Sequence, residues 1–256
     1  WRLARRHLAG VDRLSEADLR TLHELYLAEV AYADHHLGKL INWLRQTQRL
    51  DNTLVMVLAD HGESFGEHDM LEHQFHLYDS LLRIPLVVRY PTQFQAGRRV
   101  SEPVQSLDVF ATAIEAAGLP AANGPSQSLR PGHAVPRSHT YAEYGVPRKP
   151  HPRWLQRFGL EPEQLEPFQV GYTSIRNDTH KLIVGTDHSL QLYAWQTDRA
   201  ETQNLSESEP ATVERLLSDL EIWWQANGGG LAGDPALMSV TNSQVEARLR
   251  ALGYLD

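Results

Sequence analysis

The chain has 256 residues, 41% of them hydrophobic, and carries a formal net charge of −8. That length can bury a sizeable core, in one large domain or in a domain with a subdomain. The acidic charge and the scattered lysines and arginines argue against a nucleic-acid-binding surface. The absence of cysteine excludes disulfides, thiolate metal ligands and a cysteine nucleophile in this sequence. It leaves the compartment open, because periplasmic, secreted and cytoplasmic proteins can all lack cysteine.

The apolar runs and the first residues bear on membrane insertion and secretion. No apolar run reaches the roughly 18 residues of a membrane-spanning helix, so we expect no span in this segment. The first ten residues, WRLARRHLAG, are basic but precede no apolar h-region, so they are not a signal peptide. Because the sequence opens on Trp1 rather than methionine, we interpret it as the C-terminal part of a larger enzyme. The sequence has no signature of oligomeric state.

Residues 15–46 have the pattern of one long helix. Ser15, followed three residues later by Asp18, is close to a capping box. Apolar residues then recur at helical spacing as far as Leu44 and form a stripe along one face. The pattern predicts an amphipathic helix that packs this stripe against the rest of the protein.

Two short apolar runs follow the long helix and predict buried strands. Residues 53–59, TLVMVLA, are apolar on both faces, which is typical of a parallel strand. Residues 83–89, RIPLVVR, form the second run, and Pro85 places its start near a sheet edge or a bulge. We expect a loop with glycine bends over residues 62–69. Together the helix and the strands indicate the α/β class, with a mixed or parallel sheet flanked by helices.

A change of composition marks the boundary between two parts of the chain. Residues 106–117 predict a helix that ends at Gly118. Residues 120–136 are rich in Pro, Gly, Ser and Asn and have little apolar content. We therefore divide the chain into a first domain over residues 1–135 and a C-terminal subdomain over residues 136–256.

The C-terminal subdomain is predicted to be a small α+β unit. Turn signals separate short runs that we interpret as antiparallel strands, over residues 140–144, 172–175, 180–184 and 190–195. Residues 211–225 predict an amphipathic helix, and residues 243–252 a last short helix. Residues 227–233 between these helices form a glycine-rich break.

The first of the two buried strands leads directly into Asp60-His61-Gly62. In open α/β sheets, active sites lie at such strand ends. Asp60 offers a hard oxygen donor, His61 a borderline nitrogen donor, and Gly62 lets the backbone turn sharply. A local interpretation is also open, because Asp is common in turns and a histidine can simply bond within its loop.

Three histidines within nine residues follow this motif, and we expect at least one of them to be structural. His73 can bind an anionic oxygen and can act as a general acid. His68 and His76 are less specific, and His68 could brace the loop. Arg83 is either an anion contact in the pocket or the salt-bridge partner of Asp79 or Glu29. Ser64 lacks a G-x-S-x-G frame and is not predicted to be a nucleophile.

Segments throughout the chain, in their order and spacing, resemble the sulfatase family of the alkaline phosphatase superfamily. They are YLAE (26–29), DNTLV (51–55), ADHGE (59–63), GEH (66–68), YDSLLRIPL (78–86), VQSLDVFATAIEAAGL (104–119), YAE (141–143), RNDTHKLI (176–183), LYAWQTDRAETQNL (192–205) and LRALGYL (249–255). Ala111 departs from this pattern, because proline is usual at that position. The resemblance implies an α/β fold with an antiparallel C-terminal subdomain. It also implies hydrolysis of a sulfate ester, or of a related phosphate or phosphonate ester.

The resemblance also implies roles for individual residues. Asp60 and His61 fall on metal ligands. His73 falls where many sulfatases have a lysine that touches the sulfate and the leaving group, and His68 and Arg83 would contact substrate. The implied cofactor is a divalent metal ion, with calcium first. Zinc and manganese stay open because His61 stands where many members have Asn. Two cations of the subdomain, Arg176 and Lys181, would border the cleft.

The family's nucleophile is not found in this sequence. In sulfatases a Cys or Ser in a C/S-x-P-x-R frame is converted to formylglycine, and no such frame occurs here. We therefore expect formylglycine, and the paired metal-binding aspartates that accompany it, in an N-terminal half upstream of Trp1. The isolated chain should have little or no turnover. The expected partner is a sulfated small molecule or glycan.

Two further interpretations remain. A phosphoethanolamine or phosphoglycerol transferase of the same superfamily also combines an Asp-His-Gly motif with a downstream histidine. The LYAWQTDRAETQNL and LRALGYL segments favour the sulfatase. The second alternative is a binding subunit that kept the fold and lost the chemistry, against which the intact Asp60-His61-Gly62 argues.

Overall fold

The structure is a computed structural model, and it describes residues 6–8, 10–120, 124–132, 137–145 and 166–227. The helices are α2 (Glu16–Gln46), α3 (Asp79–Leu82), α4 (Asp108–Ala116) and α7 (Pro210–Asn227), with short 3₁₀ turns η1 (Leu50–Asn52), η2 (Glu67–Asp69) and η3 (Glu166–Gln169). The strands are β1 (Val55–Leu58), β2 (Ser64–Phe65), β3 (Leu71–Glu72), β4 (Leu86–Arg89), β5 (Thr140–Tyr144), β6 (Tyr172–Arg176), β7 (Lys181–Gly185) and β8 (Leu190–Tyr193). These elements form a mixed α/β fold, as the sequence predicts.

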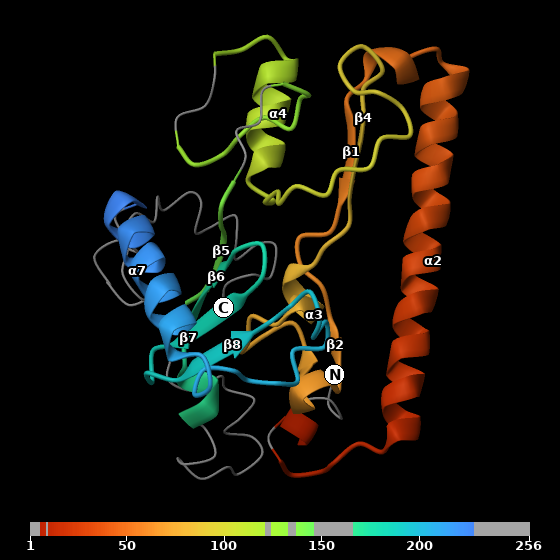
Figure 1. Ribbon diagram of the computed structural model, residues 1–256. Helices are drawn as coiled ribbons and strands as arrows, with labels where there is room; N and C mark the ends of the chain where they lie inside the picture. Colours follow the sequence, from red (N-terminus) through yellow and green to blue (C-terminus); the bar gives the residue numbers. More distant parts are fainter. Residues whose placement is uncertain (1–5, 9, 121–123, 133–136, 146–165, 228–256) are drawn as a thin grey trace, which may run out of the picture.

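The long helix α2 runs along one side of the molecule and begins where the sequence predicts (Figure 1). The Ser15 hydroxyl accepts a hydrogen bond from the Asp18 amide, and the Asp18 carboxylate accepts one from the Ser15 amide, so a complete capping box fixes the start. The predicted burial of its apolar stripe is wrong for the described residues. Leu44 is the buried residue of α2, whereas Leu25 and Leu40 are more than half exposed.

Strands β1 and β4 pair with each other in antiparallel fashion, with Val55 opposite Arg89 and Leu58 opposite Leu86. The prediction of a fully buried strand with a parallel neighbour is not met here. Each of the two strands has one strand partner within the described ranges, and β1 is half-buried throughout. The second strand starts at Leu86 rather than at residue 83, because Pro85 has no amide to donate to a ladder.

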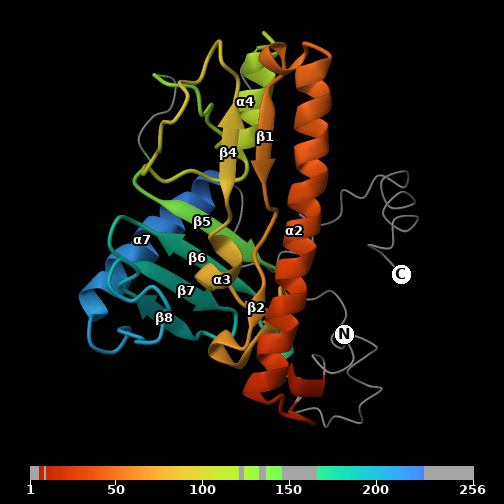
Figure 2. The same cartoon turned by 90° about the vertical axis from the view of Figure 1, so that its right-hand side faces the viewer.

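The segment predicted as a loop contains structure that the sequence did not reveal. Strands β2 and β3 form a two-stranded ribbon around η2, and the short helix α3 follows. Figure 2 shows β2 and α3 between the long helix and the sheet of the subdomain. The backbone reverses through several left-handed conformations that belong to residues with a side chain, at His68, Asp69, Glu72 and Phe75. Such conformations are typical of segments that surrounding contacts hold in place.

The C-terminal subdomain is a four-stranded antiparallel sheet in the order β5-β6-β7-β8, and α7 covers one face (Figures 1 and 2). Its core joins sheet and helix through Ile175, Leu182, Leu192, Leu216 and Leu220, each with no exposed surface. All four predicted strands and the predicted helix are confirmed, with bounds that differ by at most two residues. The sequence signal was strong because the turns at Asn177 and Gly185 separate alternating apolar runs.

Helix α4 confirms the helix predicted over residues 106–117, and it ends before Gly118, whose φ of +71° suits a C-terminal glycine. The division at residues 135 and 136 falls outside the described residues and stays a prediction. The helix predicted over residues 243–252 also lies outside them. Within the described ranges, no helix is long and apolar enough to cross a membrane.

Candidate active site

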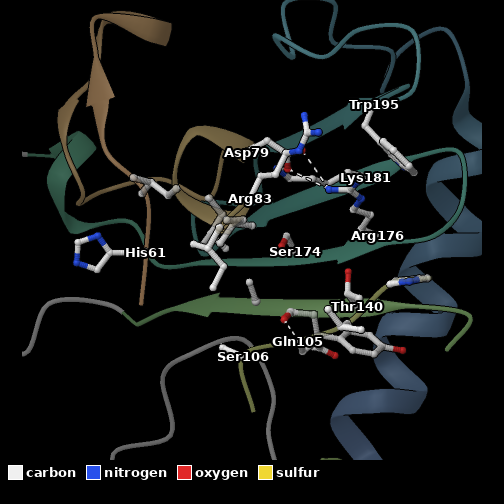
Figure 3. A pocket seen from close by; sticks show the side chains of 18 of the residues that line it. His61, Asp79, Arg83, Gln105, Ser106, Thr140, Ser174, Arg176, Lys181 and Trp195 are labelled. Carbon is white, nitrogen blue, oxygen red and sulfur yellow. Dashed lines mark hydrogen bonds and ion pairs between the residues drawn. The ribbon is translucent and has the colours of Figure 1, made fainter. Parts of the chain in front are cut away.

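A cleft of about 820 Å³ lies between the end of β1, the loop that follows it and the sheet of the subdomain. Asp60, His61 and His73 line one end of it, and Arg176 and Trp195 line the other. Figure 3 shows His61 set apart from the cationic and aromatic side chains across the cleft. The structure therefore brings the predicted metal motif, the predicted general acid and two subdomain side chains to one cavity.

The hydrogen bonds of Asp60 and His61 define what these two side chains can bind. His61 Nδ1 lies 2.8 Å from the carbonyl oxygen of Gly62, so Nδ1 carries the proton and donates. The neutral ring then has its lone pair on Nε2, which lies 3.7 Å from Asp60 Oδ2. The other oxygen of Asp60 accepts a hydrogen bond from the His61 amide. One carboxylate oxygen and one imidazole nitrogen are thus both free to meet a cation.

His73 is held by two contacts. Its Nδ1 lies 3.1 Å from Glu63 Oε2, and its ring stacks on that of His61 with centroids 4.2 Å apart. Because the carboxylate accepts, Nδ1 is protonated and Nε2 is the atom left for a ligand. Glu63 therefore orients the histidine side chain.

His76 is the structural histidine that the sequence predicted among the three. It is 4% exposed, its Nδ1 accepts from the Tyr78 amide, and its Nε2 therefore donates to Ser64 Oγ at 3.2 Å. Ser64 continues the chain to Ser80 Oγ at 2.8 Å. Burial, with smaller contributions from His68 and Lys181, lowers the pKa of His76 to about 4. The ring is neutral at physiological pH, and Ser64 is a buried link rather than a nucleophile.

His68 does not line the cleft. Its ring stacks on Tyr78 with centroids 3.6 Å apart, and its Nε2 lies 3.1 Å from the carbonyl oxygen of Ala200, to which it donates. These contacts brace the loop against the subdomain, which was the alternative that the sequence left open. The predicted contact of His68 with substrate stays a prediction.

Two arginines lie on the cleft wall, and they differ in their contacts. Arg83 is exposed and forms no hydrogen bond or ion pair with the described residues, so its guanidinium is available to an anion. Arg176 bonds to Asp79 and stacks on Trp195, with the guanidinium carbon 3.8 Å from the ring centroid. The predicted positions of Arg83 and Arg176 at the cleft are thus observed.

The sequence suggested Asp79 only as a possible partner of Arg83 and suggested no role for Glu201, although both stood inside the quoted motifs. Lys181, which is 1% exposed, lies 2.9 Å from Asp79 Oδ1 and 2.6 Å from Glu201 Oε1. Burial alone would raise the pKa of Asp79, but Lys181 and Arg176 outweigh it and hold that pKa below its usual value. A buried charged network therefore forms the floor of the cleft. A lysine at the start of an apolar strand was the available signal.

The donor set fits part of a metal site. A carboxylate oxygen beside an imidazole Nε2 suits a divalent cation of hard or borderline character. In the part of the chain that the structure describes, no group of three or more His, Asp or Glu side chains could hold a metal ion. Asp60 and His61 would therefore supply two ligands, and the others would come from elsewhere.

The strand-end site, the α/β arrangement and the appended antiparallel sheet define an alkaline-phosphatase-like α/β protein. Comparison with known proteins agrees, because residues 7–119 match the family model described as Sulfatase. The chain is 35% identical over 94 residues to an N-acetylglucosamine-6-O-sulfatase of Bacteroides thetaiotaomicron. The matched region is 37% of this chain and 17% of the relative. The chain is also 27% identical over 208 residues to arylsulfatase K of Gallus gallus. That matched region is 79% of this chain and 37% of the relative.

A solved structure extends this similarity to most of the chain. The phosphonate monoester hydrolase of Silicibacter pomeroyi matches with a TM-score of 0.70 and 26% identity, over 90% of this chain and 46% of that one. The match of residues 7–119 to the sulfatase family model confirms the resemblance found in the sequence. The chain spans less than half the length of these relatives.

Proposed function

We propose that the protein is a metal-dependent hydrolase of sulfate esters. The observation that carries the proposal is the pairing of Asp60 with His61 at the end of β1. The free Nε2 of His61 lies 3.7 Å from an Asp60 oxygen, in the cleft that His73 also lines. The relatives of this chain are named as sulfatases, which favours a sulfate ester over other anionic esters.

In this proposal the residues of the chain have distinct tasks. Asp60 and His61 hold a divalent cation, with calcium as our first choice and zinc or manganese as alternatives. When bound, such a cation polarises the ester and favours an ionised nucleophile. His73, oriented by Glu63, directs Nε2 to an oxygen of the substrate and can give the leaving oxygen a proton. Arg83 attracts the anionic substrate into the cleft.

The nucleophile and the substrate class complete the proposal. Residues 1–256 contain no C/S-x-P-x-R frame, so the proposal assigns the nucleophile, formylglycine by resemblance, to a part of the protein outside this sequence. A sulfated sugar suits the far end of the cleft, where Trp195 offers an aromatic face beside Arg176. The name of the Bacteroides relative, an N-acetylglucosamine-6-O-sulfatase, supports a glycan.

Release of sulfate from an aryl sulfate by the natural full-length protein tests the proposal. Replacing Asp60 by Asn should lower kcat/KM by at least about 100-fold, because a metal ligand loses its charge. Asp178→Asn is the matched control, since Asp178 also lines the cleft and is exposed but lies on the subdomain. Equal activity of the Asp60 variant and the control would refute the metal role. Removal of metal with a chelator, followed by calcium, zinc or manganese, identifies the ion.

A phosphonate monoester hydrolase is the second candidate. The 26% identity to the Silicibacter enzyme over 90% of this chain favours it specifically. The same protein should therefore be assayed with an aryl monoester of a phosphonate and with the aryl sulfate. A kcat/KM that is higher for the phosphonate by about tenfold or more, equivalent to about 1.4 kcal/mol of transition-state binding, would replace our first candidate by the second.

A further inference from the structure

The backbone of the metal motif is fastened to helix α3. The Gly62 amide donates a hydrogen bond at 2.8 Å to the carbonyl oxygen of Leu81, which lies in α3. Gly62 also lies against the helix so closely that a Cβ there would stand 1.9 Å from the Ser80 carbonyl oxygen. The position of Asp60 and His61 therefore depends on where α3 lies.

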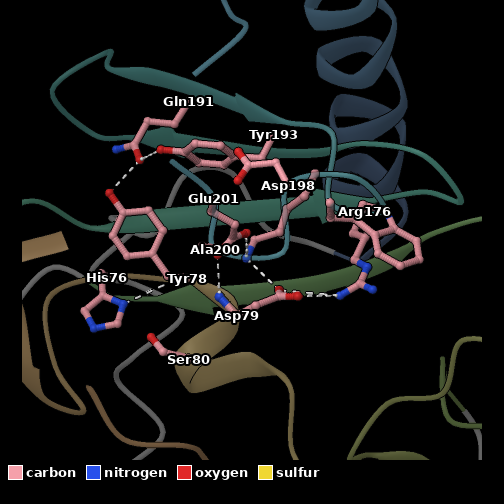
Figure 4. Close-up of polar contacts among 12 residues, drawn as sticks. His76, Tyr78, Asp79, Ser80, Arg176, Gln191, Tyr193, Asp198, Ala200 and Glu201 are labelled. Atoms are coloured by element: carbon pink, nitrogen blue, oxygen red, sulfur yellow. Dashed lines mark hydrogen bonds and ion pairs between the residues drawn. The ribbon is translucent and has the colours of Figure 1, made fainter. Parts of the chain in front are cut away.

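Helix α3 is in turn fastened to the subdomain through its first residue, Asp79. Lys181 and Arg176 bind its carboxylate at 2.9 and 3.1 Å. The backbone amide of Asp79 donates to Glu201 Oε2 at 2.6 Å. Figure 4 shows these contacts converging on Asp79 from the strands and the loop above it. Asp79, the first residue of this four-residue helix, thus has three contacts with the subdomain.

Two of the three partners of Asp79 on the subdomain are buried. Lys181 is 1% exposed and opens β7, in which every residue is buried. Glu201 is 2% exposed and has a φ of +55°, in the left-handed region that side chains of its size rarely adopt. Glu201 thus combines an unfavourable backbone conformation with a buried carboxylate that contacts both Asp79 and Lys181. Such a conformation is typical of a residue that its surroundings hold in place.

We infer that Asp79 is a positioning residue, through which the buried charges of the subdomain set the place of the Asp60-His61 pair. The contacts run from Glu201 and Lys181 to Asp79, along α3 to Leu81, and from Leu81 to Gly62. The inference rests on the proposed function, because that function is what makes the position of Asp60 and His61 matter. The contacts themselves do not depend on any reaction. It gives the antiparallel sheet a task in the site besides lining the cleft.

Hydrogen exchange at the Gly62 amide tests the inference in this chain. In Asp79→Asn the Lys181–Glu201 pair remains, so the sheet should stay folded while its hold on α3 weakens. We expect the Gly62 amide to exchange at least about tenfold faster, with the amides of Leu182 and Ile183 changed by less than about twofold. A residue that merely stabilises the fold would accelerate both sets equally.

Asp108→Asn is the matched control. Asp108 is also the first residue of a helix, is fully buried and is paired with a guanidinium, that of Arg137. It has no contact with α3 or with the metal motif among the described residues, so the Gly62 amide should keep its wild-type rate. An unchanged rate in folded Asp79→Asn, or an equal rise in Asp108→Asn, overturns the inference.

A second measurement needs no substitution and covers the case in which Asp79→Asn does not fold. In the wild type at low denaturant, the Gly62 and Asp79 amides should open together, with the same free energy and the same denaturant dependence. Independent opening of the two amides overturns the inference. Titration of the wild type with calcium, zinc and manganese separates this result from the proposed function, because a failure to bind metal leaves the exchange result intact.

Discussion

The β5–β8 sheet with α7 and the long helix α2 have similar apolar patterns and very different burial. In the first, Leu182, Leu192 and Leu220 have no exposed surface. In the second, Tyr32 is 63% exposed, and Leu44 is the buried residue of a 31-residue helix. An apolar stripe shows which face of an element is suited to burial. Whether that face is buried depends on an opposing surface, which the sheet gives α7 and which α2 meets in few places within the described residues.

The candidate site lies between these two regions and depends on both. Strand β1, which is only half-buried, leads into Asp60 and His61. The densely packed subdomain supplies Arg176, Lys181 and Trp195, and two of these residues bind Asp79 at the start of α3. We therefore expect substitutions in the two regions to differ in kind, with large effects on stability on one side and small ones on the other.

Truncation of one leucine in each region gives the largest contrast. Leu220→Ala should lower the free energy of unfolding by about 3–4 kcal/mol, because it leaves a cavity between α7 and the sheet. Leu40→Ala should cost less than about 1 kcal/mol, since Leu40 is 51% exposed. Urea denaturation of both variants, followed by tryptophan fluorescence, measures the two losses.

Both leucines are helical, so the difference in helix propensity between Leu and Ala cancels in this contrast. Equal losses in the two variants would mean that α2 is packed as tightly as α7 in solution. That result would contradict the comparison of the two regions.

The sequence predicted the elements better than their surroundings. Alternating apolar runs and turn residues are local signals, so β5–β8, α4, α7 and the capping box at Ser15 were all found. The pairing of β1 with β4 and the ribbon of β2 and β3 were missed. These depend on contacts between distant segments and on residues such as Glu72, whose backbone has a positive φ. Sequence patterns do not predict either feature.

The candidate site was predicted in part for the same reason. Asp60, His61 and His73 stood in a recognisable order, and the structure brings them into one cleft. The network of Asp79 and Glu201 joins residues that lie 122 positions apart in the chain, so no local pattern could pair them. The roles predicted for His68 and Arg83 as substrate contacts are not tested by a structure without a substrate.

The pH dependence of the unfolding free energy tests the burial of His76, beside the candidate site. The pKa of His76 is about 4 in the fold and 6.5 in a model peptide, so the folded state resists protonation. Its contribution is fully present above pH 6.5 and is lost as the pH falls from 6.5 towards 4. The loss should reach at most about 3 kcal/mol of unfolding free energy. Denaturation at several pH values measures it.

The control for this titration is His76→Gln, which keeps a donor and an acceptor and removes the ionisation. The difference in unfolding free energy between the wild type and this variant should shrink by up to about 3 kcal/mol between pH 6.5 and 4. A difference that stays constant over this range would show that His76 protonates without cost and is not buried as described.

Two glycine substitutions give the smallest effects, and they should have opposite signs. In Gly62→Ala the new Cβ meets the Ser80 carbonyl oxygen at 1.9 Å, so the backbone must shift and stability should fall by about 1–3 kcal/mol. In Gly38→Ala, inside α2, the Cβ has nothing within 4 Å, and the better helix former should add about 0.5–1 kcal/mol. Thermal unfolding of both variants reads the signs. A stabilised Gly62→Ala would show that the metal loop does not lie against α3, and the positioning role of Asp79 would then lose its first link.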